Sequence, residues 1–202
     1  MSGSNSPLGL FGGRFDPVHR AHIKIAQAVA DQLKLDEVRW IVTGSPVHKP
    51  TVASAYHRLR MVELALAELG DQRMVADDRE VIEAAAGKTN YSADTIASLQ
   101  AEFPGRPLVW ILGADQLEQF RTWSRWDWIL NQVSIAVYAR QDHKTSANFD
   151  YKINAQIYEI KSLNFPISSS WIRERLKAGE TLGNATTLSV QNYIIKHHLY
   201  LK

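Results

Sequence analysis

The stretch L-G-L-F-G-G-R-F-D-P-V-H-R-A-H, residues 8–22, decides the fold and opens the candidate site. Leu8–Phe11 is a short apolar run that predicts a buried strand, and Gly12-Gly13 indicates a tight loop after it. Apolar residues then recur at helical spacing from about Ala21 to Leu33, which predicts an amphipathic helix. Because a helix start presents unpaired backbone N–H groups and the positive end of the helix dipole, this junction suits a phosphate.

Strands and helices alternate along the rest of the chain. Further apolar runs predict strands at Val38–Val42, Leu108–Leu112, Val133–Tyr138 and Ile157–Ile160. Helical patterns predict helices at Tyr56–Leu69 (ended by Gly70), Ser92–Phe103, Ser168–Leu176 and about Thr187–His197, and the polar stretch Gln141–Tyr151 indicates a surface loop. Because the strands are almost continuously apolar, we expect an α/β fold with a doubly wound, Rossmann-like parallel sheet. In such sheets the ligand lies beyond the carboxyl ends of the strands.

The composition is that of an ordinary globular domain, with 202 residues, 45% of them hydrophobic and 22% charged. We expect one domain over 8–202, with a helical part from about 168 to 202, after a flexible lead-in over 1–7. Cysteine is absent, which excludes disulfides and cysteine-held metals. The sequence leaves open whether the chain forms a homo-oligomer.

The charge balance argues against two classes of partner. A net charge of +2, from 23 basic and 21 acidic residues, is not typical of a general nucleic-acid or membrane binder. No apolar run approaches the roughly 18 residues of a membrane span. Because residues 1–7 also lack the pattern of a secretory signal, we expect a cytoplasmic protein without nucleic-acid or membrane partners.

Two histidines mark the first candidate site. His19 and His22 lie three residues apart at the expected helix start, so their side chains share a face beside the free N–H groups. That arrangement suits phosphates, and the alternative is a capped helix with two surface histidines. A zinc site would need a third ligand and usually a glutamate after the first histidine, where Arg20 stands. We therefore expect no metal ligands from the protein.

A second stretch, I-S-S-S-W-I-R at residues 167–173, also suits an anion. One of its serines should cap the expected helix, and the others can offer hydroxyl groups. Arg173 lies one turn into that helix and can reach the same anion with its several donors. The alternative for this stretch alone is a serine-capped amphipathic helix.

Residues 13–22 resemble the signature G-x-F-D-P-x-H-x-G-H of the adenylyl- and cytidylyltransferase superfamily. The resemblance implies that His19 and His22 bind nucleotide phosphates and stabilise the charge that builds up during transfer. It also implies that the loop residues Gly12, Gly13, Arg14 and Phe15 contact ATP. The superfamily usually has Thr or Ser where Arg14 stands and Gly where Ala21 stands. Arg14 thus brings a long cation toward the phosphates.

Residues 167–173 resemble the superfamily's second signature, I-S-x-T-x-I-R, which closes over the β- and γ-phosphates of ATP. The resemblance assigns the ATP contacts to Ile167, Ser168, Ser170 and Arg173. It makes Arg173 a catalytic group together with the two histidines. Two signatures in the expected order, about 150 residues apart, are hard to obtain by chance.

Three further stretches are similar to the nicotinate-mononucleotide adenylyltransferase family, and two of them concern its acceptor. S-P-V-H-K-P at 45–50 is similar to the family's P-P-H-K-P loop, which implies that Lys49 meets a substrate phosphate. N-Y-S-A-D-T at 90–95 is similar to Y-T-x-x-T, which implies that the backbone amides of Tyr91 and Ser92 hold the nicotinate carboxylate. Free N–H groups at a helix start favour such an anion, whereas a neutral carboxamide gains less. The alternative is plain capping, with Ser92 as N-cap and Asp94 in the first turn.

The third stretch, G-A-D-Q-L-E-Q-F-R-T-W at 113–123, resembles the family's G-x-D-x-L-x-x-F-x-x-W. The resemblance implies that Gly113 and Asp115 contact the adenosine ribose or phosphates, and that Trp123 stacks on the pyridine ring. It also places Asp16 on the nicotinate mononucleotide side. After the fifth expected strand the family often has an Arg-Arg-Pro-Gly-like turn; of that turn only Arg140 is kept here.

The resemblance implies adenylyl transfer from ATP to nicotinate mononucleotide, with Mg²⁺ held mostly by phosphates and water. The nearest alternative is another enzyme of the superfamily, a cytidylyltransferase or an adenylyltransferase whose acceptor is nicotinamide mononucleotide or pantetheine phosphate. A second alternative is a catalytically silent nucleotide-binding regulator, favoured by Arg14. A third, an RNA-binding protein, lacks the expected basic stripe with interleaved aromatic residues.

Overall fold

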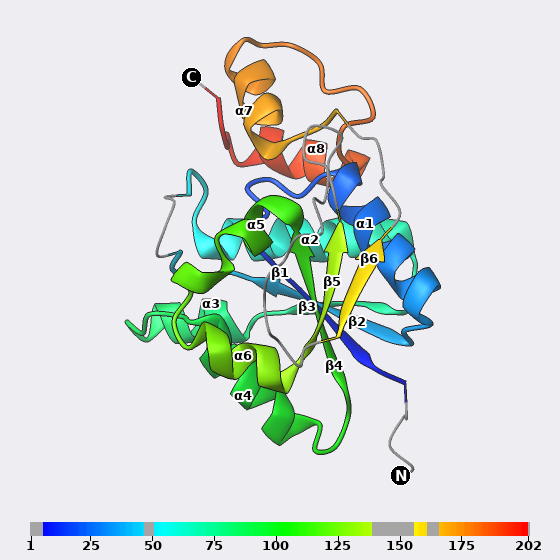
Figure 1. Ribbon diagram of the computed structural model, residues 1–202. Helices are drawn as coiled ribbons and strands as arrows, with labels where there is room; N and C mark the ends of the chain where they lie inside the picture. The colour runs from blue at the N-terminus through cyan, green and yellow to red at the C-terminus, as the bar shows by residue number, and fades with distance from the viewer. Residues whose placement is uncertain (1–5, 47–50, 139–155, 161–165, 202) are drawn as a thin grey trace.

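A six-stranded parallel sheet forms the centre of the molecule (Figure 1). The computed structural model describes residues 6–46, 51–138, 156–160 and 166–201. The strand order is β3-β2-β1-β4-β5-β6. Strands β1 to β3 extend the sheet toward one edge and β4 to β6 toward the other, so the topological switch point lies between β1 and β4. The strands are β1 (Leu8–Gly13), β2 (Glu37–Val42), β3 (Met74–Asp77), β4 (Leu108–Gly113), β5 (Ser134–Tyr138) and β6 (Ile157–Ile160). The doubly wound, Rossmann-like sheet expected from the sequence is confirmed.

Helices cover both faces of the sheet and its carboxyl edge. They are α1 (Arg20–Leu33), α2 (Ala55–Leu69), α3 (Arg79–Ala85), α4 (Ser92–Glu102), α5 (Ala114–Glu118), η1 (Phe120–Thr122), α6 (Trp126–Gln132), α7 (Ser169–Lys177) and α8 (Leu188–Lys196). The apolar clusters place α1, α2 and α8 on one face, and α4, α5 and α6 on the other. Figure 1 shows α7 and α8 beyond the arrowheads of β5 and β6, where the ligand of such a sheet binds.

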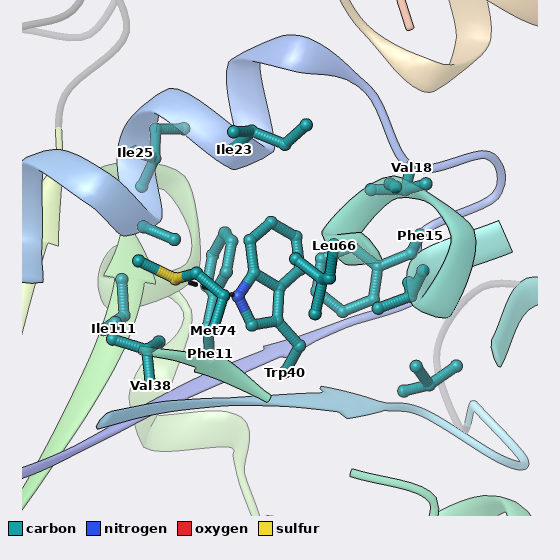
Figure 2. Close-up of a cluster of buried hydrophobic side chains, with 14 of the residues drawn as sticks. Phe11, Phe15, Val18, Ile23, Ile25, Val38, Trp40, Leu66, Met74 and Ile111 are labelled. Atoms are coloured by element: carbon teal, nitrogen blue, oxygen red, sulfur yellow. Dashed lines mark hydrogen bonds between the residues drawn. The ribbon is translucent and has the colours of Figure 1, made fainter. Parts of the chain in front are cut away.

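The face under α1 and α2 has an aromatic core (Figure 2). Trp40 on β2 is fully buried, and its indole N–H donates to the sulfur of Met74 at 3.4 Å. The rings of Phe11 and Phe15 lie 5.0 and 5.3 Å from that of Trp40, centroid to centroid. Since Phe11 lies in β1 and Phe15 in the loop that follows it, the core holds the end of the strand and the start of that loop.

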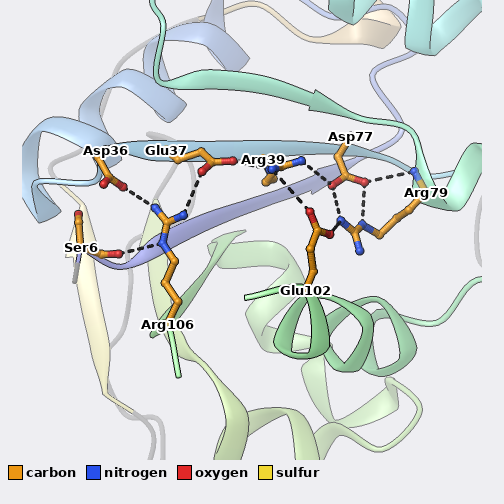
Figure 3. A network of polar contacts seen from close by, with 8 residues as sticks. All are labelled: Ser6, Asp36, Glu37, Arg39, Asp77, Arg79, Glu102 and Arg106. Carbon is orange, nitrogen blue, oxygen red and sulfur yellow. Dashed lines mark hydrogen bonds and ion pairs between the residues drawn. The ribbon is translucent and has the colours of Figure 1, made fainter. Parts of the chain in front are cut away.

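Near the β3 edge, the opposite face is polar instead (Figure 3). Arg79 donates to Asp77 at 2.8 Å and to Glu102 at 2.7 Å, so it joins the end of β3 to the end of α4. The whole network comprises Ser6, Asp36, Glu37, Arg39, Asp77, Arg79, Glu102 and Arg106. Single exposed ion pairs contribute little stability. A connected set of this kind fixes how α4 lies against the sheet.

The structure corrects the predicted elements in several places. The sequence reading placed no strand at 74–77 and no helices at 79–85, 114–118 or 126–132, where β3, α3, α5 and α6 lie. β3 has only four residues, which is too few to show a clear alternation of apolar and polar side chains. α3 and α5, with seven and five residues, are too short to show a helical pattern. Elsewhere the predicted bounds differ by one or two residues, as helix and strand ends usually do.

Two sequence expectations concern other parts of the chain. The predicted surface loop at 141–151 and the residual Arg140 lie outside the described residues. Among the helices that the structure describes, none is long and apolar enough to cross a membrane.

Candidate active site

The loop between β1 and α1 is held in place by the C-terminal part of the chain. Three consecutive carbonyl groups in this loop, at residues 16–18, each accept a hydrogen bond from a distant side chain. The donors are Arg173, Ser169 and Thr186, at 2.7, 2.9 and 2.9 Å. Both signature stretches predicted from the sequence therefore meet, and Arg173 lies against the loop that leads into α1.

The two signature histidines form a stacked pair at the start of α1. The ring centroids of His19 and His22 are 3.7 Å apart, with 29° between the ring planes. The backbone N–H of His19 donates to Nδ1 of His22 at 3.2 Å. A ring nitrogen that accepts a hydrogen bond is unprotonated, so the neutral His22 ring carries its proton on Nε2. The predicted shared face is confirmed, with His19 buried and His22 half-buried.

Gly12 and Gly13 end strand β1 and do not form the tight loop predicted from the sequence, and packing leaves little room for a side chain at either position. A Cβ on Gly12 would lie 3.2 Å from the Trp110 ring, and one on Gly13 would lie 2.9 Å from the Phe15 ring. Phe15 has a positive φ of 49° and only 2% exposure, so its side chain belongs to the core. Any contact that Phe15 makes with ATP must therefore come from its backbone. The predicted ATP contacts of Gly12, Gly13 and the half-buried Arg14 stay predictions.

Asp16 is a buried junction between segments that are far apart in the sequence. Its carboxylate accepts hydrogen bonds from the N–H groups of Val52 and Ala53, at 2.7 and 3.1 Å. It also accepts one from the hydroxyl of Tyr200 at 2.6 Å. Burial, together with this bond to Asp16, raises the pKa of Tyr200, which therefore stays a donor. The resemblance predicts that Asp16 contacts nicotinate mononucleotide. In the structure its carboxylate is hydrogen-bonded within the protein.

Arg58 is a fully buried cation that the sequence reading missed. Its guanidinium donates to the carbonyl groups of Arg14, Gly44 and Ala53, at 2.8, 3.2 and 3.2 Å. Burial lowers the pKa of Arg58, and the nearby Asp16 carboxylate opposes that shift. Arg58 joins the loop after β1 to the loop after β2. Its position one turn before Met61 and Val62, on the apolar side of α2, was the signal available in the sequence.

The start of α7 carries the second signature. Ser168 is the N-cap, and its hydroxyl accepts from the N–H of Trp171 at 3.1 Å, which confirms the predicted serine cap. The hydroxyl of Ser170 is exposed and accepts from Arg173 at 3.2 Å. Ile167, partly buried, packs in a small apolar cluster beneath. Ser170 and Arg173 are thus adjacent, as a shared phosphate ligand requires.

The carboxyl end of β4 supplies another part of the site. Gly113 ends β4 and caps α5, and a Cβ there would crowd the carboxylate of Asp115. The half-buried Trp123 packs against Phe120, with ring centroids 5.0 Å apart, and edge-on to Trp110 at 6.3 Å. Its ring orientation is therefore set by the core. The ligand contacts assigned to Gly113, Asp115 and Trp123 stay predictions.

The start of α4 differs in one respect from the sequence reading. The N-cap is Tyr91 and not Ser92, and no side chain caps this helix start. Ser92 is the first helical residue, and Asp94 lies in the first turn as expected. Tyr91 is 41% exposed and Ser92 half-buried, so an anion can approach these amides from solvent. Lys49, the predicted phosphate ligand in the loop after β2, lies outside the described residues.

Behind the start of α4, buried polar groups tie it to the loop after β2. Asn90 accepts a hydrogen bond from the N–H of Ser45 at 3.2 Å and donates to Glu83 at 2.9 Å. Glu80 accepts one from the hydroxyl of Thr95 at 2.7 Å. Asn90 and Thr95 lie within the predicted stretch 90–95, but no motif pointed to Glu80 or Glu83, which act beneath the surface that a ligand would touch.

These features define a class of protein before any comparison: a doubly wound α/β protein whose parallel sheet carries, at its carboxyl edge, helix starts and basic side chains suited to a nucleotide. Comparison with known families agrees. The family described as cytidylyltransferase-like matches residues 10–175, so the chain belongs to that family.

Two bacterial relatives indicate more closely which enzymes of this family the chain resembles. A protein of Neisseria meningitidis serogroup B named "Probable nicotinate-nucleotide adenylyltransferase" is 36% identical, over 96% of this chain and 98% of its own. A Bordetella pertussis protein of the same name is 37% identical, over 96% and 97%. At this identity and coverage the chain belongs to the nicotinate-nucleotide adenylyltransferase family.

A solved structure supports the fold. The nicotinic acid mononucleotide adenylyltransferase of Plasmodium falciparum, complexed with NaAD, superposes with a TM-score of 0.83 at 19% identity. The match covers 96% of this chain and 97% of that one. The Rossmann-like nucleotidylyltransferase fold is thereby confirmed.

Proposed function

We propose that the chain transfers the adenylyl group of ATP to nicotinate mononucleotide. A phosphate oxygen of nicotinate mononucleotide attacks the α-phosphorus, and the bond from that phosphorus to the oxygen bridging to the β-phosphate breaks. Pyrophosphate leaves with the bonding electrons, and nicotinate adenine dinucleotide forms. The observation that carries the proposal is the union of the two phosphate signatures, in which Arg173 lies on the loop leading to the stacked His19 and His22.

The reaction needs placement and charge stabilisation, since no protein group forms a covalent bond. His19 and His22 stabilise the charge at the α- and β-phosphates, with Nε2 of His22 as a donor. Arg173 and Ser170, already hydrogen-bonded to each other, hold the leaving pyrophosphate. Lys49 orients the attacking phosphate.

The acceptor's pyridine ring is held at the other end of the site. The amides of Tyr91 and Ser92, at a helix start with no side-chain cap, bind the nicotinate carboxylate. Trp123 stacks on the ring, and such a stack contributes about 0.5–1.5 kcal/mol beyond burial. The names of the bacterial relatives and the NaAD complex of the structural neighbour support this choice of substrate.

Mg²⁺ belongs to the same proposal. We expect the ion to be held mostly by phosphate oxygens and water, as Mg²⁺ usually is when it binds with a nucleotide. When bound, it neutralises phosphate charge. We also propose that the reaction takes place in the cytoplasm.

Pyrophosphate release with ATP and Mg²⁺ tests the proposal, with nicotinate mononucleotide and nicotinamide mononucleotide as parallel acceptors. We expect release with the acid, at least about tenfold less with the amide, and a dinucleotide product confirmed by its mass. Release only with pantetheine phosphate would move the chain to another acceptor. ATP binding without release with any acceptor would favour the silent regulator.

A further inference from the structure

Three chain segments meet at one buried carboxyl group, that of Glu80 on α3. Glu80 is only 5% exposed, and Thr95, one turn into α4, is 4% exposed. The carboxyl group accepts the Thr95 hydroxyl at 2.7 Å and the backbone N–H of Gly44, in the loop after β2. A Cβ on Gly44 would overlap the carbonyl oxygen of Glu80, so this contact admits only glycine. Glu80 therefore positions both the loop after β2 and the start of α4.

The Thr95 hydroxyl connects Glu80 to the first turn of α4. Its oxygen lies 2.7 Å from Oε1 of Glu80 and 3.4 Å from the carbonyl oxygen of Tyr91. The hydroxyl carries one proton and can donate in one direction only. When Glu80 is ionised, Thr95 donates to it. When Glu80 is neutral, its own O–H can donate to Thr95, and the Thr95 hydroxyl can turn to Tyr91.

The surroundings of Glu80 favour its neutral form. Burial raises its pKa to about 7, with smaller contributions in the same direction from Glu83 on α3 and Asp77 on β3. The hydrogen bonds from Thr95 and Gly44 oppose the shift without cancelling it. The buried cation that faces it from α2 is Arg58, which is committed to three carbonyl groups. Glu80 thus changes charge near neutral pH, next to the proposed carboxylate subsite.

We propose that Glu80 is a specificity-determining positioning residue, which sets how strongly the start of α4 prefers a pyridine carboxylate over a carboxamide. Neutral Glu80 leaves the positive end of α4 unopposed, so the carboxylate is favoured. Ionised Glu80 places a negative charge behind the amides of Tyr91 and Ser92, and part of that preference is lost. The inference rests on the proposed function, because it assigns the nicotinate group to those amides.

The acid-over-amide preference should depend on pH. Glu80 is neutral below about pH 7 and ionised above it, so the acid-over-amide preference should fall as the pH rises. The readout is the ratio of kcat/KM for nicotinate mononucleotide to kcat/KM for nicotinamide mononucleotide, from pH 6 to 8.5. Titration of the histidines and of the acceptor phosphate affects both substrates and cancels in the ratio.

We expect this ratio to fall about threefold to tenfold across that range in the wild-type chain. Glu80→Gln keeps the size, a donor for Thr95 and an acceptor for Gly44, but cannot ionise. Its ratio should be high and independent of pH. A wild-type ratio that does not change with pH, or an equal slope in Glu80→Gln, would overturn the proposal.

Glu83→Gln is the matched control, since it removes one negative charge from the same helix at a half-buried position. Its ratio should still fall as the pH rises, with the midpoint moved slightly to lower pH, because Glu83 no longer helps to raise the pKa of Glu80. Thr95→Val provides a second test if Glu80→Gln does not fold. Without the Thr95 hydrogen bond the ionised form of Glu80 loses support, so the fall in the ratio should move to higher pH. If the midpoint of this fall is the same in Thr95→Val as in wild type, the inference is wrong. If the wild-type chain turns over neither acceptor, the proposed function is wrong instead.

Discussion

The two ends of the candidate site are built differently. At the phosphate end, the side chains of His19 and His22 stack on each other, and Arg173 donates to the backbone carbonyl of Asp16 in the loop that leads to them. At the pyridine end, the groups proposed to hold the carboxylate are backbone amides of α4, beside the ring-stacking Trp123, and side chains buried behind α4 position those amides. Of the side chains that support this backbone, Asn90 and Thr95 lie within a signature stretch, whereas Glu80 lies outside every stretch that resembles the family.

The hydrogen bonds of the two loops show the same difference. In the loop after β1, the carbonyl groups of residues 16–18 are taken by distant side chains. In the loop after β2, the N–H groups of Gly44 and Ser45 are taken instead, by Glu80 and Asn90. In the described part of the second loop, these two N–H groups are therefore committed to the protein itself.

The largest expected effect comes from breaking the phosphate end. His22→Ala removes a donor aimed at developing charge, so turnover should fall about 10²–10³-fold. Lys24→Ala, an exposed cation on the same helix, is the matched control and should keep wild-type turnover. Steady-state pyrophosphate release measures both, with circular dichroism to confirm folding. Near-full activity of a folded His22→Ala chain would rule out the proposed mechanism.

The next effect concerns the support of the pyridine end. Gly44→Ala forces a Cβ against the Glu80 carbonyl oxygen and the Cβ of Ala84, so α3 must shift. We expect a loss of about 3 kcal/mol in the free energy of unfolding. Gly70→Ala is the matched comparison: Gly70 has a φ of 69° and open space around it. That strain alone costs about 1 kcal/mol. Urea unfolding that ranks the two variants equally would show that α3 does not pack on Gly44 as described.

The smallest effect concerns the tie between the C-terminus and the loop after β1. Tyr200→Phe removes the hydroxyl that donates to Asp16, while the bonds from Val52 and Ala53 remain. The expected loss is about 1–2 kcal/mol, because the lost bond reaches a carboxylate. Thermal unfolding measures it, and Tyr193→Phe, whose half-buried hydroxyl contacts His57, is the control. An unchanged melting temperature in Tyr200→Phe would mean that the buried bond does not stabilise the fold.

Much of the fold could be predicted, because the central strands are continuously apolar and α1 and α2 have clear helical periods. Gly70 caps α2 in the left-handed conformation as expected. β3 could not be predicted, because a four-residue edge strand that ends at a buried Asp77 shows no period. Its place is set by pairing with β2 and by the ion network around Arg79.

The candidate site was predictable to the extent that it consists of motifs. The meeting of residues 12–22 with 167–173 followed from the two signatures, and the structure shows the contacts between them. Arg58, Glu80 and Tyr200 could not be assigned, because each acts through tertiary contacts with residues far away in the sequence. Asp16 shows the converse: a signature residue whose carboxylate is bonded within the protein.

The division between the two ends is tested most directly by measuring kcat/KM with both acceptors, nicotinate mononucleotide and nicotinamide mononucleotide, in wild type and in His22→Ala. If the phosphate end serves turnover and the pyridine end serves selection, both values should fall in the variant by the same factor of about 10²–10³. The acid-over-amide ratio should then remain that of wild type. A ratio that changes about tenfold while His22 is the only residue altered would contradict the account.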